Sequence, residues 1–550
     1  MPSTHEVTNQ AAPLVGYNLF ATNRGLHDAL QFNAPGLGTA PLHDLGAVLG
    51  RAEMQEHARL ANQHKPQLHS HDRFGRRLDE VEFHPSYHAL MEQATAAGLH
   101  GTPWVAGGQA HVQRAAAFML FTELEPSVLC PISMTYAVTP ALRTNAAIHA
   151  AWLPKLASTA YDPRLLPFEQ KAGVTMGMGM TEKQGGSDVR TNTTAATFDA
   201  QTPWGARYRL VGHKWFMSAP MCDAFLVLAQ TGAGLSCLFL PRVLPGAAGT
   251  RNGLFIQRLK DKLGNQANAS CEVEFDGALA WLVGDEGRGV PQILEMGTRT
   301  RLDCALGTSG LMRQALSLAL HHTAQRHAFG RALIEQPLMR NVLADLALES
   351  EAATALSLRL ARAFASDTEH ELQMRRLLTP IAKFWICKRG SHFAQEAMEC
   401  LGGNGYVEEA GAGVMARIYR EMPVNSIWEG AGNIMALDLL RALRKGGKEG
   451  DCVTALQQEL APARGSHAAL DRFAAQLFMR IDAAGEETEA RRLAQDIALA
   501  VQAALLCQHA PSFVFDAFCR SRLAADWGHA FGTLPASAEF DALLARAMPH

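Results

Sequence analysis

The amino-acid sequence predicts an α+β protein. We expect an N-terminal helical domain, a central antiparallel β domain, a C-terminal helical bundle and an extra C-terminal helical domain. Three observations predict this order. Apolar residues repeat with helical spacing before residue 176 and after residue 288. Between these positions the apolar period changes to two, as in half-exposed strands. At 550 residues the chain is also too long for one hydrophobic core, which favours three or four domains.

The first segment, 1–175, is predicted to be mainly helical. Its most apolar stretch, Ala115 to Leu120, is expected to lie in a buried helix. The stretch 60–85 is polar and rich in His and Arg, which is typical of a solvated surface loop. A subunit contact or a covering segment over a site is the alternative interpretation of that stretch.

The second segment, 176–287, is predicted to form the sheet. Residues 207–211 begin an alternation of polar and apolar side chains, and residues 270–275 alternate cleanly. Alternation of this kind is typical of antiparallel strands with one solvated face. No Gly-x-Gly-x-x-Gly motif follows a strand, so a Rossmann-type dinucleotide site is not predicted.

The third segment, 288–445, is predicted to be a bundle of long helices, and the fourth, 446–550, a further helical domain after Gly446 and Gly447. One face of a bundle helix is marked by apolar residues three, four and seven positions apart. This stripe consists of Met339, Val342, Leu343, Leu346, Ala353, Leu356 and Leu360.

Composition excludes several classes of function. The net charge is −3, so no overall basic field attracts the chain to nucleic acid or to a membrane surface. The ten cysteines show no Cys-x-x-Cys pair and no zinc-ligand spacing, so no metal site is predicted. No apolar run approaches the roughly 20 residues of a membrane span, and the N-terminus lacks a signal-peptide pattern. A reducing cytoplasm is the expected location, without a membrane partner.

One carboxylate, Glu429, stands between apolar residues and glycines in the stretch Ile427-Trp428-Glu429-Gly430-Ala431-Gly432-Asn433. Apolar neighbours would raise the pKa of this carboxyl toward neutrality, as a catalytic base requires. An ordinary loop acid is the alternative interpretation. A second unusual stretch lies far upstream, Met180-Thr181-Glu182-Lys183-Gln184-Gly185-Gly186-Ser187-Asp188.

Together with 212–218, 325–330 and 401–406, these two stretches resemble the motifs of the acyl-CoA dehydrogenase family of flavoproteins, in that family's order. Several ordered motifs are far more specific than any single one. Thr-Glu-Lys-Gln-Gly-Gly-Ser-Asp, the stretch 420–430 and the extra C-terminal segment are similar to the AidB branch of the family. The family's architecture is also helices, sheet and helical bundle.

This resemblance implies FAD as cofactor and an acyl-CoA or similar thioester as small-molecule partner. Glu429 would be the base that removes the α-proton, while the flavin accepts hydride. Some family members carry the base on the helix after residue 288. The aligned position here is Thr300, and the nearest acid, Asp303, is expected to pair with Arg299 or Arg301. Glu429 is therefore the preferred base, with Asp303 as the competing candidate.

The resemblance also implies a set of cofactor-binding residues. The set consists of Met178, Gly179, Met180, Thr181, Ser187, Trp215, Phe216, Met217, Ser218, Arg326, Phe329, Gly402, Gly403, Gly405, Ile427, Trp428, Gly430, Gly432 and Asn433. By themselves, Thr181 and Ser187 suit a turn or an N-cap, and the aromatic residues suit a core. Arg326 suits a helix end and Asn433 a helix cap.

In the family, the diphosphate of the flavin contacts a neighbouring subunit through an Arg-x-x-Phe-Gly stretch and a Gly-Gly-x-Gly stretch. The matching positions here are Arg326 to Gly330 and Gly402 to Gly405. A guanidinium suits phosphate through its forked donors. This resemblance implies a homo-oligomer, a dimer of dimers or homotetramer.

The AidB branch is associated with double-stranded DNA binding, protection against alkylation damage and weak, isovaleryl-CoA-like dehydrogenase activity. Residues 441–550 contain 12 Lys and Arg against 13 Asp and Glu, whereas a DNA-binding domain is normally basic. The candidate DNA contacts are Arg441, Arg444, Lys445, Arg520 and Arg522. Cations before glycines also stabilise a helix end, which is the competing interpretation of the first three. An ordinary metabolic acyl-CoA dehydrogenase without DNA binding is the alternative function.

Overall fold

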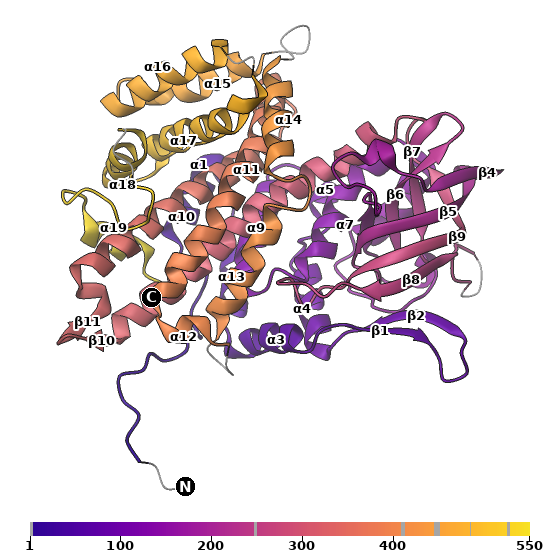
Figure 1. Cartoon of the computed structure of the whole chain (residues 1–550), viewed down its shortest axis with the longest axis horizontal. Coiled ribbons are helices and arrows are strands. Elements are labelled where there is room, and N and C mark those ends of the chain that lie inside the picture. Colours follow the sequence, from indigo (N-terminus) through magenta and orange to yellow (C-terminus); the bar gives the residue numbers. More distant parts are fainter. Residues whose placement is uncertain (1–3, 247–249, 409–412, 445–450, 484–485, 525–527) are drawn as a thin grey trace. The chain divides into compact units, whose positions relative to one another are not determined.

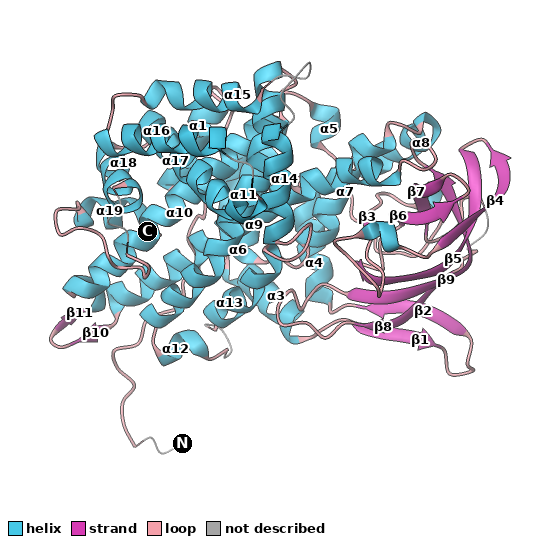
Figure 2. Cartoon of the chain, turned by 45° about the horizontal axis from the view of Figure 1, so that its top comes forward, coloured by secondary structure: helices cyan, strands magenta, loops and turns pink. Residues whose placement is uncertain are grey.

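The computed structural model describes residues 4–246, 250–408, 413–444, 451–483, 486–524 and 528–550. The chain forms two compact units. The first comprises residues 1–55, 111–124 and 304–550, and the second comprises 56–110 and 125–303. Figure 2 shows helices in the first unit and the strands of the main sheet in the second. Gly446, Gly447 and Lys445 lie outside the described residues.

The second unit is built on a seven-stranded sheet (Figure 1). Its strands are β3 (Met176–Gly179), β4 (Ala195–Thr202), β5 (Gly205–Ser218), β6 (Ala224–Thr231), β7 (Gly234–Pro241), β8 (Leu254–Leu259) and β9 (Ser270–Leu282). The order is β3-β6-β4-β5-β9-β7, with β8 beside β9. Strand β6 also pairs with β7. The strands β6, β4, β5, β9 and β7 therefore form a closed sheet.

The sheet is mixed, whereas the sequence predicts an antiparallel one. Strand β3 pairs with β6 in parallel, with Met176 opposite Ala224 and Gly179 opposite Val227. Residues 224–229 are all buried, so β6 has no solvated face along this length. A continuous apolar strand of this kind is typical of parallel pairing, and it carries no alternation from which direction can be inferred.

Further elements of the second unit are mostly helices. They are α4 (Pro85–Ala96), α5 (Pro103–Ala106), α7 (Leu129–Leu142) and α8 (Ala146–Leu156). Helix α3 (Ala52–Gln63) begins in the first unit and ends in the second. The predicted surface loop at 60–85 contains a hairpin instead, β1 (Gln67–His71) and β2 (Arg77–Glu82). Asp72 makes the turn, because its carboxylate accepts the backbone amides of Phe74 and Arg76 at 2.8 Å.

The first unit is a helical bundle. Its helices before residue 445 are α1 (Arg24–Asn33), α2 (Ala40–Leu49), α6 (Ala110–Leu124), α10 (Pro337–Phe364), α11 (Glu369–Cys400), α12 (Gly403–Tyr406), α13 (Val414–Asn425) and α14 (Gly432–Arg444). Helix α9 (Gly289–Gln325) runs from the second unit into the first. Of the predicted stripe on α10, Leu343, Leu346, Ala353, Leu356 and Leu360 are buried. Met339 and Val342, in the first two turns, are not.

The segment after residue 450 belongs to the same compact unit as the bundle. Its helices are α15 (Cys452–Leu460), α16 (Ala468–Ala483), α17 (Ala490–His509), α18 (Ser512–Phe518) and α19 (Phe540–Ala547). Helix α17 packs against α10, α11 and α14 (Figure 1). Arg359 of α10 is fully buried and pairs with Glu459 of α15 at 2.6 Å. No helix among the described residues has the length and apolarity that a membrane crossing requires.

Candidate active site

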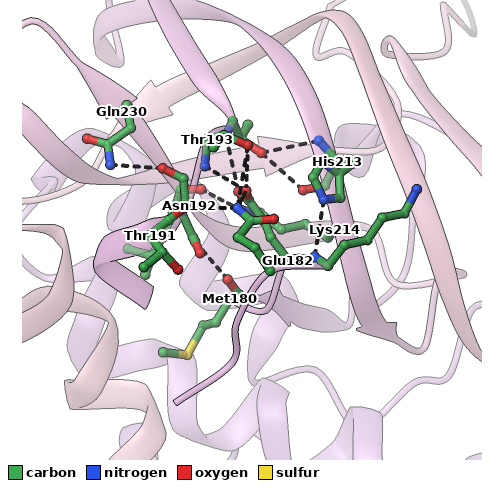
Figure 3. A network of polar contacts seen from close by, with 12 residues as sticks. Met180, Glu182, Thr191, Asn192, Thr193, His213, Lys214 and Gln230 are labelled. Carbon is green, nitrogen blue, oxygen red and sulfur yellow. Dashed lines mark hydrogen bonds and ion pairs between the residues drawn. The ribbon is translucent and has the colours of Figure 1, made fainter. Parts of the chain in front are cut away.

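The loop after β3 carries the first group of candidate residues. Thr181 is half-buried and Ser187 is exposed. Within the described part of the chain, no hydrogen bond engages either side-chain hydroxyl. The Thr181 carbonyl accepts the Trp215 amide at 2.9 Å. Asn192 donates to the Met180 carbonyl at 2.9 Å (Figure 3). At residues 180 and 181 the loop is therefore held through its backbone carbonyls, and these contacts engage neither hydroxyl.

Strand β5 is irregular where it meets this loop. Its register with β9 shifts between Lys214 and Met217, so Trp215 and Phe216 lie in a bulge. The bulge directs the Trp215 amide to Thr181 instead of to β9. Bulges often re-aim side chains beside active sites. The fold thus brings Thr181 and Trp215 together, although 33 intervening residues separate them.

The four β5 candidates differ in exposure. Phe216 is 50% exposed and Trp215 is half-buried, whereas Met217 is fully buried. The Lys260 ammonium lies 3.3 Å from the centre of the Trp215 ring. The Ser218 hydroxyl is 3.3 Å from that of Ser270. Trp215, Phe216 and Ser218 therefore have surface for a ligand, while the Met217 side chain belongs to the core.

A buried ion pair, absent from the predicted site, underlies the loop. Glu182 and Lys214 are in contact at 2.7 Å, and neither side chain is exposed to solvent. Burial alone would raise the pKa of Glu182, but the Lys214 charge and several hydrogen bonds outweigh it and lower the pKa to about 2. Burial lowers the pKa of Lys214, and Glu182 partly offsets this effect. The sequence could have indicated this pair, because Lys214 is a charged residue at an inward-facing position of a strand and would need a buried partner.

Glu429 lies in the first unit with a strained backbone. Its φ is 59°, a left-handed conformation that residues other than glycine rarely adopt. The Lys383 ammonium donates to the carbonyl of the next residue, Gly430. The Trp428 indole N–H is buried without a hydrogen-bond partner among the described residues. Ile427, however, is 64% exposed, so this predicted apolar flank does not shield the carboxylate within this chain.

The competing acid, Asp303, lies on α9 and is buried. Arg299 pairs with Glu295, one turn earlier, with Nη1 and Oε2 3.2 Å apart. Thr300, at the aligned position, is also buried and donates its hydroxyl to the Gly297 carbonyl at 3.0 Å. Thr300 offers no carboxylate, so Glu429 and Asp303 are the two acids to compare.

Residues 329–330 form the tip of a two-stranded hairpin, β10 (His327–Ala328) and β11 (Arg331–Ala332), and Arg326 directly precedes it. Phe329 is 97% exposed with φ of 52°. The Arg326 guanidinium donates to the Asn9 carbonyl. Among the glycines at 402–405, Gly402 has φ of 60°. A Cβ on Gly405 would lie 2.4 Å from the Met398 carbonyl oxygen. The backbone at Gly402 and the close approach at Gly405 thus favour glycine, and the Phe329 ring is almost wholly exposed.

Asn433 lies in the first turn of α14, which begins at Gly432, and therefore does not occupy the capping position. Its Oδ1 accepts a long hydrogen bond, 3.4 Å, from Arg491 of α17. A Cβ on Gly432 would lie 2.6 Å from Lys388 Cε. A larger residue here would therefore have to displace the end of the Lys388 side chain.

The candidate DNA contacts divide into two groups. Arg441 and Arg444 are exposed in the last turn of α14, and Lys445 lies outside the described residues. Arg520 pairs with Asp516 at 3.4 Å on the surface. Arg522 is buried and pairs with Asp345 and Glu349. The expectation that Arg522 contacts DNA is therefore wrong for this fold, because its guanidinium is enclosed by carboxylates.

Comparison with known proteins supplies the context for these residues. Residues 9–163 match the N-terminal domain of the adaptive response protein AidB. Residues 177–278 and 287–444 match the middle and C-terminal domains of acyl-CoA dehydrogenases. The chain is 47% identical to Escherichia coli (strain K12) AidB over 94% of each chain. This chain belongs to the acyl-CoA dehydrogenase family, and it is AidB-like.

A sequence match and a structural match both come from Caenorhabditis elegans. Acyl-CoA dehydrogenase family member 11 is 33% identical over 72% of this chain and 65% of its own length. The crystal structure of ACDH-11 in complex with C11-CoA has a TM-score of 0.83 at 27% identity, covering 96% of this chain and 95% of that one. The acyl-CoA dehydrogenase fold is thereby confirmed. As a member of this FAD-dependent family, the chain is a flavin oxidoreductase.

Proposed function

We propose that this flavoprotein dehydrogenates an acyl thioester and that Glu429 is the base that removes the α-proton. The observation that carries the proposal is the left-handed backbone of Glu429. Such a conformation costs of the order of 1–3 kcal/mol and is found at functional sites, where it aims a side chain. Lys383 supports the conformation, since it is buried and donates to the adjoining Gly430 carbonyl. Weak, isovaleryl-CoA-like activity is the form that the AidB likeness suggests.

The residues of the second unit fit the flavin. The hydroxyls of Thr181, Ser187 and Ser218 are donors for ring oxygens and phosphate, and Trp215 and Phe216 offer apolar surface for the ring. When bound, FAD supplies the acceptor for hydride from the β-carbon, which no side chain can provide. The task of the chain's own residues is to hold the ring and to keep a carboxylate ready for the α-proton.

Glu429→Gln tests the base directly. The amide keeps the size of the side chain but cannot accept the proton. The variant should retain FAD and lose anaerobic bleaching of the flavin by an acyl-CoA, by about 10²-fold or more in rate. Asp303→Asn is the matched control and should bleach normally. Normal bleaching by Glu429→Gln together with loss in Asp303→Asn would move the base to α9.

A second function, duplex DNA binding in the alkylation-damage response, is supported by the exposed Arg441 and Arg444 at the end of α14. Contacts to phosphate would be sequence-blind and salt-sensitive. Arg441→Gln with Arg444→Gln should reduce duplex affinity and the steepness of its salt dependence. Arg51→Gln with Arg288→Gln removes the same charge from other exposed positions and should have less effect. Absence of binding at low salt rejects this function and favours an ordinary metabolic dehydrogenase.

We further propose a homotetramer, organised as a dimer of dimers, in which Arg326, Phe329 and the glycines at 402–405 approach the flavin of a neighbouring subunit. The exposure of Phe329 supports this contact.

We also propose that the chain divides into four domains, with boundaries at residues 176, 288 and 446. No disulfide forms among the ten cysteines, which all lie in the described part of the chain, and this favours a reducing compartment such as the cytoplasm.

A further inference from the structure

Glu182 and Lys214, hereafter the buried pair, find their hydrogen-bond partners within the second unit. The Lys214 ammonium donates to Glu182 Oε1 and to the Leu228 carbonyl, each at 2.7 Å. The other carboxylate oxygen, Oε2, accepts hydrogen bonds from the Thr193 amide at 2.7 Å (Figure 3) and from Gln184 Nε2 at 2.8 Å. The pair therefore joins the loop after β3 to β5, β6 and the segment before β4.

The residues on either side of the buried pair are also joined to one another. Trp215 donates its amide to the Thr181 carbonyl at 2.9 Å. The Lys183 amide donates to His213 Nε2 at 3.2 Å. Three consecutive loop residues are thus tied to three consecutive strand residues, in opposite chain directions. The buried pair is the central and only ionic tie of the three.

Stability alone does not explain an ionic tie at this place. Removing two charges from water is costly, and apolar residues of similar volume often replace a buried ion pair with no loss of stability. What an ion pair with several directed hydrogen bonds supplies is a defined geometry. Here the defined geometry is the spacing between Thr181 and Trp215, the two neighbours of the pair that are assigned to the flavin.

We propose that Glu182 and Lys214 are positioning residues for the cofactor. They set the distance between the Thr181 loop and the Trp215 bulge, so that both meet the flavin ring in one arrangement. Neither side chain is exposed, so the effect acts through Thr181 and Trp215 rather than by contact with the ring. This inference rests on the proposed flavin site.

The test compares full-length wild type with Lys214→Met and with the double variant Glu182→Leu/Lys214→Met. Lys214→Met leaves a buried carboxylate without its cation, so both the unfolding midpoint and the FAD affinity should fall. In the double variant the midpoint should return toward wild type, because the uncompensated charge is gone. The FAD affinity should stay roughly tenfold or more below wild type, because the supporting geometry is lost.

Two further measurements separate positioning from simple stability. In the FAD-free double variant, the Trp215 amide should exchange with solvent faster than in FAD-free wild type, since its bond to Thr181 is loosened. The reduction potential of the FAD that does bind should also shift. The proposal is overturned if the double variant has the FAD affinity, the FAD reduction potential and the Trp215 amide exchange rate of wild type.

Gln184→Ala provides a second test, which does not require the core to repack. Gln184 is exposed, and its loss removes one hydrogen bond to Glu182 Oε2 and one to the Thr191 carbonyl. FAD affinity should fall severalfold, while Gln257→Ala, at an exposed amide on β8, should leave it unchanged. Equal affinities for the two variants contradict the proposal. Thr181→Val tests the site itself: unchanged FAD affinity in that variant refutes the flavin assignment rather than the positioning role.

Discussion

Arg522 and Glu349 form a buried ion pair, with Nη2 and Oε2 3.0 Å apart. The same guanidinium contacts Asp345, and Arg389 contacts the same glutamate at 3.0 Å. Asp345 and Glu349 lie one turn apart on α10, whereas Arg522 lies in the π-helical turn Cys519–Leu523. The segment after residue 450 is therefore joined to the bundle through charges that are removed from water.

Arg522→Leu should destabilise the protein strongly. The variant leaves two carboxylates facing each other without this cation, and breaking a buried pair in this way costs about 3–5 kcal/mol. Arg520→Leu is the control, because Arg520 pairs with Asp516 on the surface and its loss should cost less than about 1 kcal/mol. Urea denaturation measures both changes. Equal midpoints for the two variants would contradict the importance assigned to the buried network.

His509 should make the stability depend on pH between 6.5 and 4. Burial lowers the pKa of its imidazole to about 4, and its ring packs beside Phe32. The unfolded chain binds a proton at this position below pH 6.5, whereas the folded chain does so only below pH 4. Stability should therefore fall as pH decreases through this window, by about 1–2 kcal/mol between pH 7 and pH 5.

His509→Phe isolates this contribution. Phenylalanine occupies similar space and has no proton to bind. The difference in unfolding free energy between pH 7 and pH 5 should be smaller in the variant by that same amount. Identical pH profiles for variant and wild type would show that the imidazole binds its proton equally well in the folded and the unfolded chain, contrary to the expectation.

Glu429→Gly should be more stable than Glu429→Gln. Both variants lose the carboxylate, but only glycine adopts a φ of 59° without steric cost. The difference in unfolding free energy should be about 1 kcal/mol in favour of glycine. Chemical denaturation of the FAD-free proteins measures it. A less stable glycine variant would mean that the surrounding loop imposes no strain on residue 429.

Phe329→Asp should weaken the proposed tetramer. The ring is 97% exposed on the β10–β11 hairpin, where a charge would have to be buried in any subunit contact. Sedimentation should show smaller species at concentrations where wild type is fully assembled. Phe74→Asp alters a ring that is 71% exposed on the β1–β2 hairpin and should leave assembly unchanged. The opposite pattern would place the subunit contact on the other hairpin.

Local patterns predicted the elements well where one face of an element is buried. The alternation in 270–275 predicted a strand, and β9 occupies this stretch. The stripe on α10 predicted the buried residues of its central turns. Prediction was weaker where the pattern carries no direction or no apolar face. Strand β6 is buried on both faces, so its sequence did not show that it pairs in parallel with β3. The polar hairpin at 67–82 has too little apolar surface to be distinguished from a loop.

The sequence by itself determined which family the chain belongs to, because family motifs are runs of neighbouring residues in a set order. Tertiary structure alone decided the partners of the charged side chains. Arg522 meets Glu349 and Lys214 meets Glu182 across long stretches of chain. Periodicity shows whether a face is buried, but not which opposite charge lies across it. A buried charge needs a partner in space, and that partner exists only once distant segments have packed together.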